Sequence, residues 1–130
     1  MTQIEDLSKS RAQDRREHTR YSAHHLAVFV RSLREEGENW IPGEIIAVDF
    51  NRYGMALETV HNFNTGDLLA MVIRNDDYSM AEVVGIICNR TQSERGFRFG
   101  IRFDFDDSEQ GKQIADELLM LEKKTAEAIH

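Results

Sequence analysis

Gly-Phe-Arg-Phe-Gly-Ile-Arg-Phe, residues 96–103, is the stretch of this sequence that decides the fold. Large apolar side chains occupy every second position, and arginine or glycine stands between them. Because successive side chains of a β-strand point to opposite faces of a sheet, this alternation predicts a strand that is apolar on one face only. We expect that face to cover a hydrophobic core. It is formed by Phe97, Phe99, Ile101 and Phe103.

Five further apolar runs precede this strand, and polar or glycine-containing segments typical of turns separate them. The second run contains the only proline, Pro42, near its start, where an edge strand or a bulge tolerates it. The fourth run is apolar without interruption. The predicted strands span residues 26–33, 40–50, 55–59, 68–73, 81–88 and 97–103.

The period of the apolar residues changes after Asp106 and predicts an amphipathic helix over about residues 107–128. Asp107 is the expected N-cap, with Gln110 three residues later as in a capping box. The apolar stripe consists of Ile114, Leu118, Leu121 and Ala128. Six strands and one closing helix predict an all-β fold with a C-terminal helix, in the form of a six-stranded antiparallel barrel.

A chain of 130 residues with 41% hydrophobic residues suits one domain with one core. Residues 1–19 have only Ile4 and Leu7 as large apolar side chains. They show no sustained period, which predicts a flexible N-terminal arm. Residues 20–130 are then the barrel domain with its helix.

The overall charge excludes some classes of partner. The net charge is −7, which argues against a broad surface for duplex nucleic acid or anionic lipid. No apolar run approaches the roughly 18 residues of a membrane span, and the first residues lack the apolar stretch of a signal peptide. The lone cysteine, Cys88, cannot form a disulfide within the chain, and we expect it in the core. These features favour a cytoplasmic protein without membrane insertion.

No motif of an enzyme is present in the sequence. It lacks G-x-S-x-G, G-x-x-x-x-G-K-[ST], G-x-G-x-x-G and H-E-x-x-H. His24 and His25 are adjacent, so on a strand they point to opposite faces and do not readily share a metal. We therefore predict no catalytic residue, no metal site and no cofactor.

A pair of arginines four positions apart precedes the first predicted strand. Arg16 and Arg20 form the pattern R-x-x-x-R, and Arg15 stands directly in front of it. This spacing places both guanidinium groups on one side of either an extended segment or a helix. Such a pair suits a compact anionic ligand better than a long polyanion. The alternative is a solvated basic arm without a ligand.

A second polar motif lies at the turn between the predicted second and third strands. It reads Asp-Phe-Asn-Arg-Tyr-Gly over residues 49–54. Asp49, Asn51 and Gly54 are the candidate functional residues, and their alternative interpretation is a plain hairpin turn.

Together the two motifs resemble the signatures of the PilZ family, R-x-x-x-R followed some thirty residues later by [DN]-x-S-x-x-G. Their order, their spacing and the strands around them match, and Asn51 stands where the family most often has serine. The resemblance extends from Arg15 to the C-terminal helix and includes residues 96–103 as the closing strand. It implies a six-stranded antiparallel PilZ-type barrel and the bacterial second messenger cyclic di-GMP as ligand.

The chemistry of these residues agrees with that ligand, which carries two phosphates and two guanines. Arginine can grip phosphate oxygens, bond the O6/N7 edge of guanine and stack on its ring. Asp49 can accept hydrogen bonds from the guanine N1 and N2 donors, and the Asn51 amide can donate or accept. Gly54 offers close approach where a side chain would obstruct.

The sequence thus predicts a receptor domain that captures cyclic di-GMP, orders its arm and changes the surface shown to an unidentified protein partner. In PilZ relatives a basic residue in the position of Arg15 accompanies an intercalated cyclic di-GMP dimer, so we expect two ligands per chain. The first alternative is a degenerate PilZ scaffold that binds no nucleotide and acts by protein–protein interaction. The second alternative is a barrel that binds single-stranded nucleic acid through exposed aromatic side chains. The negative net charge of the chain argues against this alternative, so we predict no nucleic-acid partner.

Overall fold

The computed structural model describes residues 18–33, 40–77 and 79–128. All but the last two residues of the predicted arm, and with them any test of its flexibility, lie outside these ranges. The described chain forms a mostly β structure with one C-terminal helix, as predicted. Its elements are β1 (Tyr21–Ser22), β2 (Ala27–Ser32), β3 (Ile45–Asn51), β4 (Gly54–Thr59), β5 (Leu68–Arg74), β6 (Met80–Ser93), β7 (Gly96–Asp104) and α2 (Glu109–Glu127).

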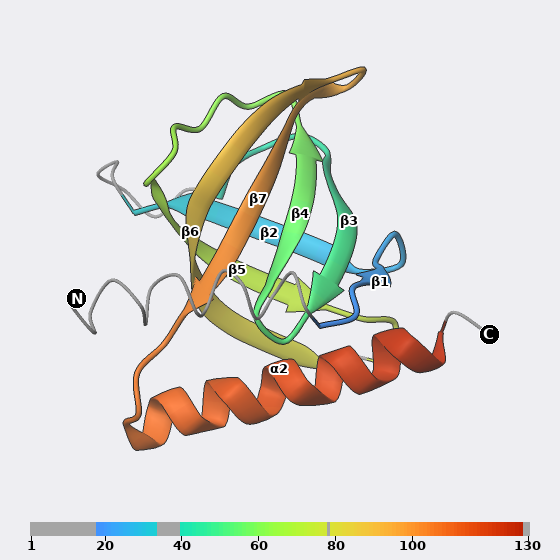
Figure 1. Ribbon diagram of the computed structural model, residues 1–130, viewed down its shortest axis with the longest axis vertical. Helices are drawn as coiled ribbons and strands as arrows, with labels where there is room; N and C mark the ends of the chain where they lie inside the picture. The colour runs from blue at the N-terminus through green and yellow to red at the C-terminus, as the bar shows by residue number, and fades with distance from the viewer. Residues whose placement is uncertain (1–17, 34–39, 78, 129–130) are drawn as a thin grey trace.

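The strands form one antiparallel sheet in the order β1-β3-β4-β7-β6-β5-β2. The sheet curls into a half-barrel, and α2 lies across its open lower end (Figure 1). The edge strand β2 is also linked to the segment that leads into β3, because the backbone N–H of Ile41 donates to the carbonyl of Val30 at 2.9 Å. This link brings the two ends of the curled sheet towards each other.

The core lies inside the curl, and the predicted apolar face of residues 96–103 belongs to it. Phe99, Ile101 and Phe103 are buried, and Phe97 packs against the core while partly exposed. From α2, Leu118 and Leu121 are fully buried against the same cluster. These aromatics therefore serve the core and do not offer an exposed stacking platform for nucleic-acid bases.

The described residues form seven strands where six were predicted. The additional strand, β1, pairs Tyr21 with Phe50 and Ser22 with Asp49. Two residues are too few to show an alternation, so only the pairing itself reveals this strand. The predicted strand over 40–50 begins at Ile45, and the one over 81–88 continues to Ser93 as a polar hairpin arm paired with β7. Backbone hydrogen bonds extend that arm beyond its apolar residues.

Cys88 is exposed, so the prediction that it lies in the core is wrong. The register between β6 and β7 shifts between Ile87 and Asn89, where Ile87 pairs with Ile101 and Asn89 with Gly100. Inward and outward residues alternate along β6 up to the buried Ile87, so Cys88 after it points outward. The bulge then places Asn89 on the outer face as well.

The helix α2 begins one residue later than predicted, because its N-cap is Ser108 and not Asp107. The Ser108 hydroxyl accepts a hydrogen bond from the N–H of Gly111 at 3.1 Å. Ser108 also donates through its hydroxyl and its N–H to Asp106, and these bonds lower the pKa of the Asp106 carboxyl. In the part of the chain that the structure describes, no helix is both long and apolar enough to cross a membrane.

Candidate ligand-binding site

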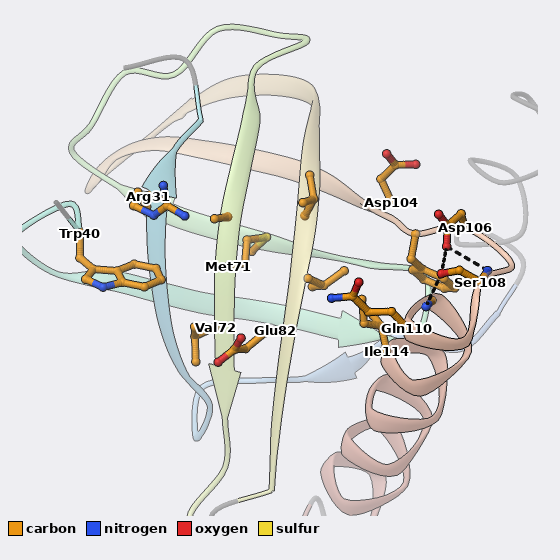
Figure 2. Close-up of a pocket in the computed structure, with 15 residues that line it drawn as sticks. Arg31, Trp40, Met71, Val72, Glu82, Asp104, Asp106, Ser108, Gln110 and Ile114 are labelled. Carbon is orange, nitrogen blue, oxygen red and sulfur yellow. Dashed lines mark hydrogen bonds between the residues drawn. The ribbon is translucent and has the colours of Figure 1, made fainter. Parts of the chain in front are cut away.

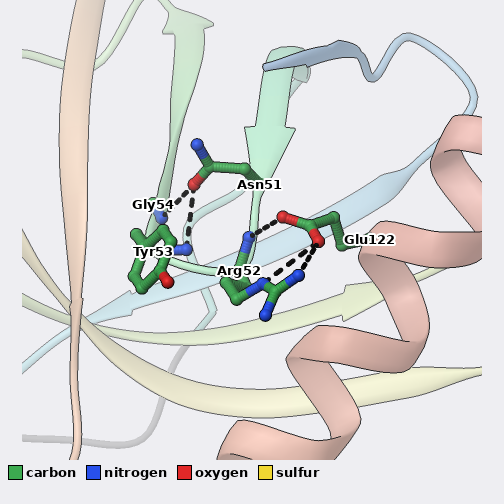
Figure 3. A network of polar contacts seen from close by, with 5 residues as sticks. All are labelled: Asn51, Arg52, Tyr53, Gly54 and Glu122. Carbon is green, nitrogen blue, oxygen red and sulfur yellow. Dashed lines mark hydrogen bonds and ion pairs between the residues drawn. The ribbon is translucent and has the colours of Figure 1, made fainter. Parts of the chain in front are cut away.

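The second motif forms a tight hairpin turn, as predicted (Figure 3). Asn51 pairs with Gly54 across the two turn residues Arg52 and Tyr53. The Asn51 side-chain oxygen accepts hydrogen bonds from the backbone N–H groups of Tyr53 at 2.9 Å and Gly54 at 3.1 Å. Asn51 is 0% exposed. Its side-chain oxygen therefore holds the turn together, a role that the sequence interpretation did not assign to it.

The turn is fastened to the C-terminal helix by an ion pair that the sequence did not reveal. Glu122 of α2, only 8% exposed, accepts from the Arg52 backbone N–H at 3.0 Å. It also accepts from Arg52 Nε at 3.1 Å and Nη2 at 2.7 Å (Figure 3). The hydrogen bonds to Glu122 raise the pKa of the Arg52 guanidinium above its ordinary value, so this side chain stays cationic. The geometry of the turn is thus tied to the position of α2.

The described end of the first motif lies against the second motif. Arg20 Nη1 is 3.7 Å from Asp49 Oδ2, with the arginine about half exposed and the carboxylate mostly buried. The ring of His18 lies 4.8 Å from the ring of Tyr53. The fold thus brings together two segments some thirty residues apart in the sequence. Arg15 and Arg16 lie outside the described residues.

The outer face of the sheet beside these residues carries small side chains. Across the strands Asp49 pairs with Ala56, and Ala56 with Gly100. Gly54 is an extended residue of β4 and is not among the glycines with positive φ, which are Gly43, Gly66 and Gly96. Its missing side chain therefore matters for close approach over the sheet and not for backbone conformation.

Arg102 is a further residue of this face, and sequence reasoning missed it. It pairs directly with Gly54, so the row Asn51, Gly54, Arg102 crosses three neighbouring strands. Among the described residues, the buried Nε of Arg102 has no hydrogen-bond partner. A guanidinium with a buried nitrogen that makes no hydrogen bond is a candidate anion ligand in an acidic protein. The alternation in residues 96–103 does predict that Arg102 points outward, but no sequence pattern places Arg102 beside Gly54.

The scan against family models agrees with the fold and the two motifs. Residues 14–120 match the PilZ domain, and this region contains all the predicted site residues. The chain belongs to the PilZ domain family, as its sequence motifs predicted. No curated protein matches the chain.

Proposed function

We propose that this PilZ domain is a receptor for cyclic di-GMP that carries out no reaction on its ligand. The observation that carries the proposal is the contact between Arg20 and Asp49, supported by the contact between the rings of His18 and Tyr53. Arg20, the described arginine of the first motif, thus lies against the second motif. This arrangement suits a ligand with phosphates and guanines presented side by side.

Each group has a defined task in the proposed complex. Arg15, Arg16 and Arg20 bind phosphate oxygens and stack on guanine, because the guanidinium is a planar cation with several donors. The Asp49 carboxylate accepts from guanine N1 and N2. Asn51 keeps the turn in shape, and Gly54 leaves room for the ligand above the sheet.

Arg102 is proposed as an additional anion ligand beside Gly54. A charge-assisted hydrogen bond contributes about 1.5 to 3 kcal/mol, so Arg102→Ala is expected to weaken binding about 10- to 100-fold. Arg98→Ala is the matched control, since Arg98 lies on the same strand and the same outer face but pairs with Glu58. If the two variants bind cyclic di-GMP with equal affinity, Arg102 is not part of the binding site.

Ligand capture is proposed to order the arm, residues 1–19, over the sheet and so to change the surface offered to a protein partner. Amide hydrogen exchange around residues 15–21 is the test: protection should rise on addition of cyclic di-GMP. Protection that is already high without ligand, and does not change, would contradict this switch. We place the protein in the cytoplasm, where the exposed thiol of Cys88 stays reduced.

Calorimetric titration of the full chain with cyclic di-GMP tests the receptor itself. We expect binding with two ligands per chain, because Arg15 precedes the motif. A stoichiometry of one ligand per chain would contradict the intercalated dimer of cyclic di-GMP but would still support a receptor for this ligand. Absence of binding at millimolar ligand would instead favour the alternative, a PilZ scaffold that acts through protein contacts alone.

A further inference from the structure

A second region of the sheet has a chemistry unlike that of the ligand site. The outward positions of β2, β5 and β6 are mostly apolar, with three charged residues among them. We call this region the apolar face. Its apolar members are Ala27, Phe29, Leu68, Ala70, Val72, Met80, Val84 and Ile86.

Strand β5 lies in the middle of the apolar face and is apolar on both of its sides. Its inward residues Leu69, Met71 and Ile73 are buried in the core. On the outer side, Leu68 of β5, Phe29 of β2 and Met80 of β6 are between 42% and 46% exposed. Uninterrupted apolar strands are typical of sheets covered on both faces. The sequence of β5 therefore fits a strand whose outer side is also covered.

A groove of about 440 Å³ lies on the apolar face, where Ala70, Val72 and Val84 line it. Figure 2 shows it between Arg31 and Trp40 on one side and the start of α2, with Gln110 and Ile114, on the other. Trp40 is 46% exposed, and the Arg31 guanidinium lies 5.8 Å from the centre of its ring. Exposed tryptophan and arginine beside an apolar patch are the residues that most often anchor protein interfaces.

The charges around the apolar face favour a second copy of this chain as the occupant. Arg31 and Arg74 lie within it, Glu82 lies beside Val72, and Asp104 ends the row that starts at Arg31. The face is thus balanced in charge, whereas the whole chain carries −7. Two copies repel each other through their net charge, and contact through a face that is balanced in charge adds little to that repulsion.

We propose that the protein self-associates into a symmetric dimer through the apolar face of β2, β5 and β6. In a twofold dimer the same face meets itself, so arginines of one copy approach acidic residues of the other. Exposed large side chains of one copy enter the groove of the second copy. The proposal does not depend on cyclic di-GMP, because the apolar face and the candidate ligand site lie on different strands.

The size of the face sets the expected strength of the dimer. Three strands with six or seven paired residues each give a planar footprint of roughly 300 Å² per copy, from about 3.3 Å per residue and 4.8 Å between strands. Trp40 and the rims of the groove add to it. The interface is smaller than a standard specific interface, which predicts a weak, transient dimer with a dissociation constant of about 100 µM or weaker.

Sedimentation equilibrium of the full chain over about 1 µM to 1 mM tests the dimer. The mass should rise with concentration from that of the 15.0 kDa monomer towards twice that value. Because apolar contact drives the dimer and salt screens the repulsion between acidic chains, added salt should preserve or strengthen it. A monomer at all concentrations, or an association that disappears at high salt, would overturn the proposal.

Two variants and one control assign the dimer to this face. Phe29→Glu and Leu68→Glu introduce charge at exposed positions on two different strands, so each should fold and each should remain monomeric. Val60→Glu is the control, since Val60 is 70% exposed just after β4 and outside the apolar face. Melting curves verify folding. If the Phe29→Glu and Leu68→Glu variants both dimerise as strongly as the wild type, the dimer does not form through the apolar face.

Discussion

Two halves of one curled sheet present different chemistry to the outside. Over β4 and β7 the outward positions are glycine, alanine or charged, as in the row formed by Ala56 and Gly100. Over β2, β5 and β6 they are mostly apolar, as at Phe29 and Leu68. Both halves use the same inward alternation to build one core. The fold therefore leaves the outward positions free to differ, and the proposals above assign a small anionic ligand to one half and a second copy of the chain to the other.

The halves also differ in how firmly they are held. On the ligand side, the turn of residues 51–54 is fixed by the Asn51 side chain and fastened to α2 through Arg52 and Glu122. On the other side, the large residues Phe29, Leu68 and Met80 remain partly exposed. We therefore expect mutations in the polar site to change ligand affinity, and mutations in the apolar face to change self-association. The following predictions test that separation.

The largest effect is expected for the choice of base at the ligand side. Adenine presents an acceptor at N1 and no amine at C2, so it offers no donor to Asp49. A site built to bond one edge can reject an analogue that lacks it by about 10⁴-fold, so cyclic di-AMP should bind far more weakly than cyclic di-GMP. Asp49→Ala should weaken cyclic di-GMP strongly. Competition titrations measure both; equal affinity of the wild type for the two ligands would mean that Asp49 does not read guanine.

Arg20→Ala separates the two halves directly. Loss of a charge-assisted contact should weaken cyclic di-GMP binding about 10- to 100-fold. The fold and the dimer should be unaffected, because the Arg20 side chain is about half exposed and its partner Asp49 belongs to β3, which is not part of the apolar face. Arg95→Ala, in the exposed β6–β7 turn, is the control for loss of one positive charge. Unchanged affinity of Arg20→Ala with an unchanged melting temperature would show that the site has been misplaced.

Glu122→Ala tests the link between the turn and α2. The substitution leaves the Arg52 backbone N–H and guanidinium without their acceptor. The free energy of unfolding should fall by about 2 kcal/mol, which lowers Tm by roughly 8 °C in a domain of this size. Ligand affinity should fall as well, because the turn loses its support. Glu127→Ala, at the exposed end of the same helix, should leave both quantities near the wild-type values.

The smallest effect is expected for Asn51→Ser. A serine hydroxyl can accept from the backbone N–H two residues later, so the turn keeps part of its support. Binding should be preserved or modestly tightened, and stability should change by less than about 1 kcal/mol. Asn51→Ala is the contrast, since it leaves the N–H groups of Tyr53 and Gly54 without their acceptor. A serine variant as impaired as the alanine variant would show that the amide itself is required.

The sequence by itself determined the class of fold, the inward face of the strands, the C-terminal helix and the family. These features are local: alternation over residues 96–103 fixes which side chains face the core, and a change of period marks α2. The two motifs were recognisable because their residues are close in sequence. The N-cap was misassigned by one position because Asp107 and Ser108 are both good caps, and only hydrogen bonding to Gly111 distinguishes them.

Only the tertiary structure decided which outward residues are neighbours. Periodicity states that a side chain points outward, but strand order and register state what lies beside it. Strand order and register depend on the free energy of the whole packed chain. Thus Arg102 lies beside Gly54, and Arg52 meets a glutamate 70 residues away. The register shift after Ile87 and the open outer side of β5 are likewise properties of the assembled sheet, since no local pattern records them.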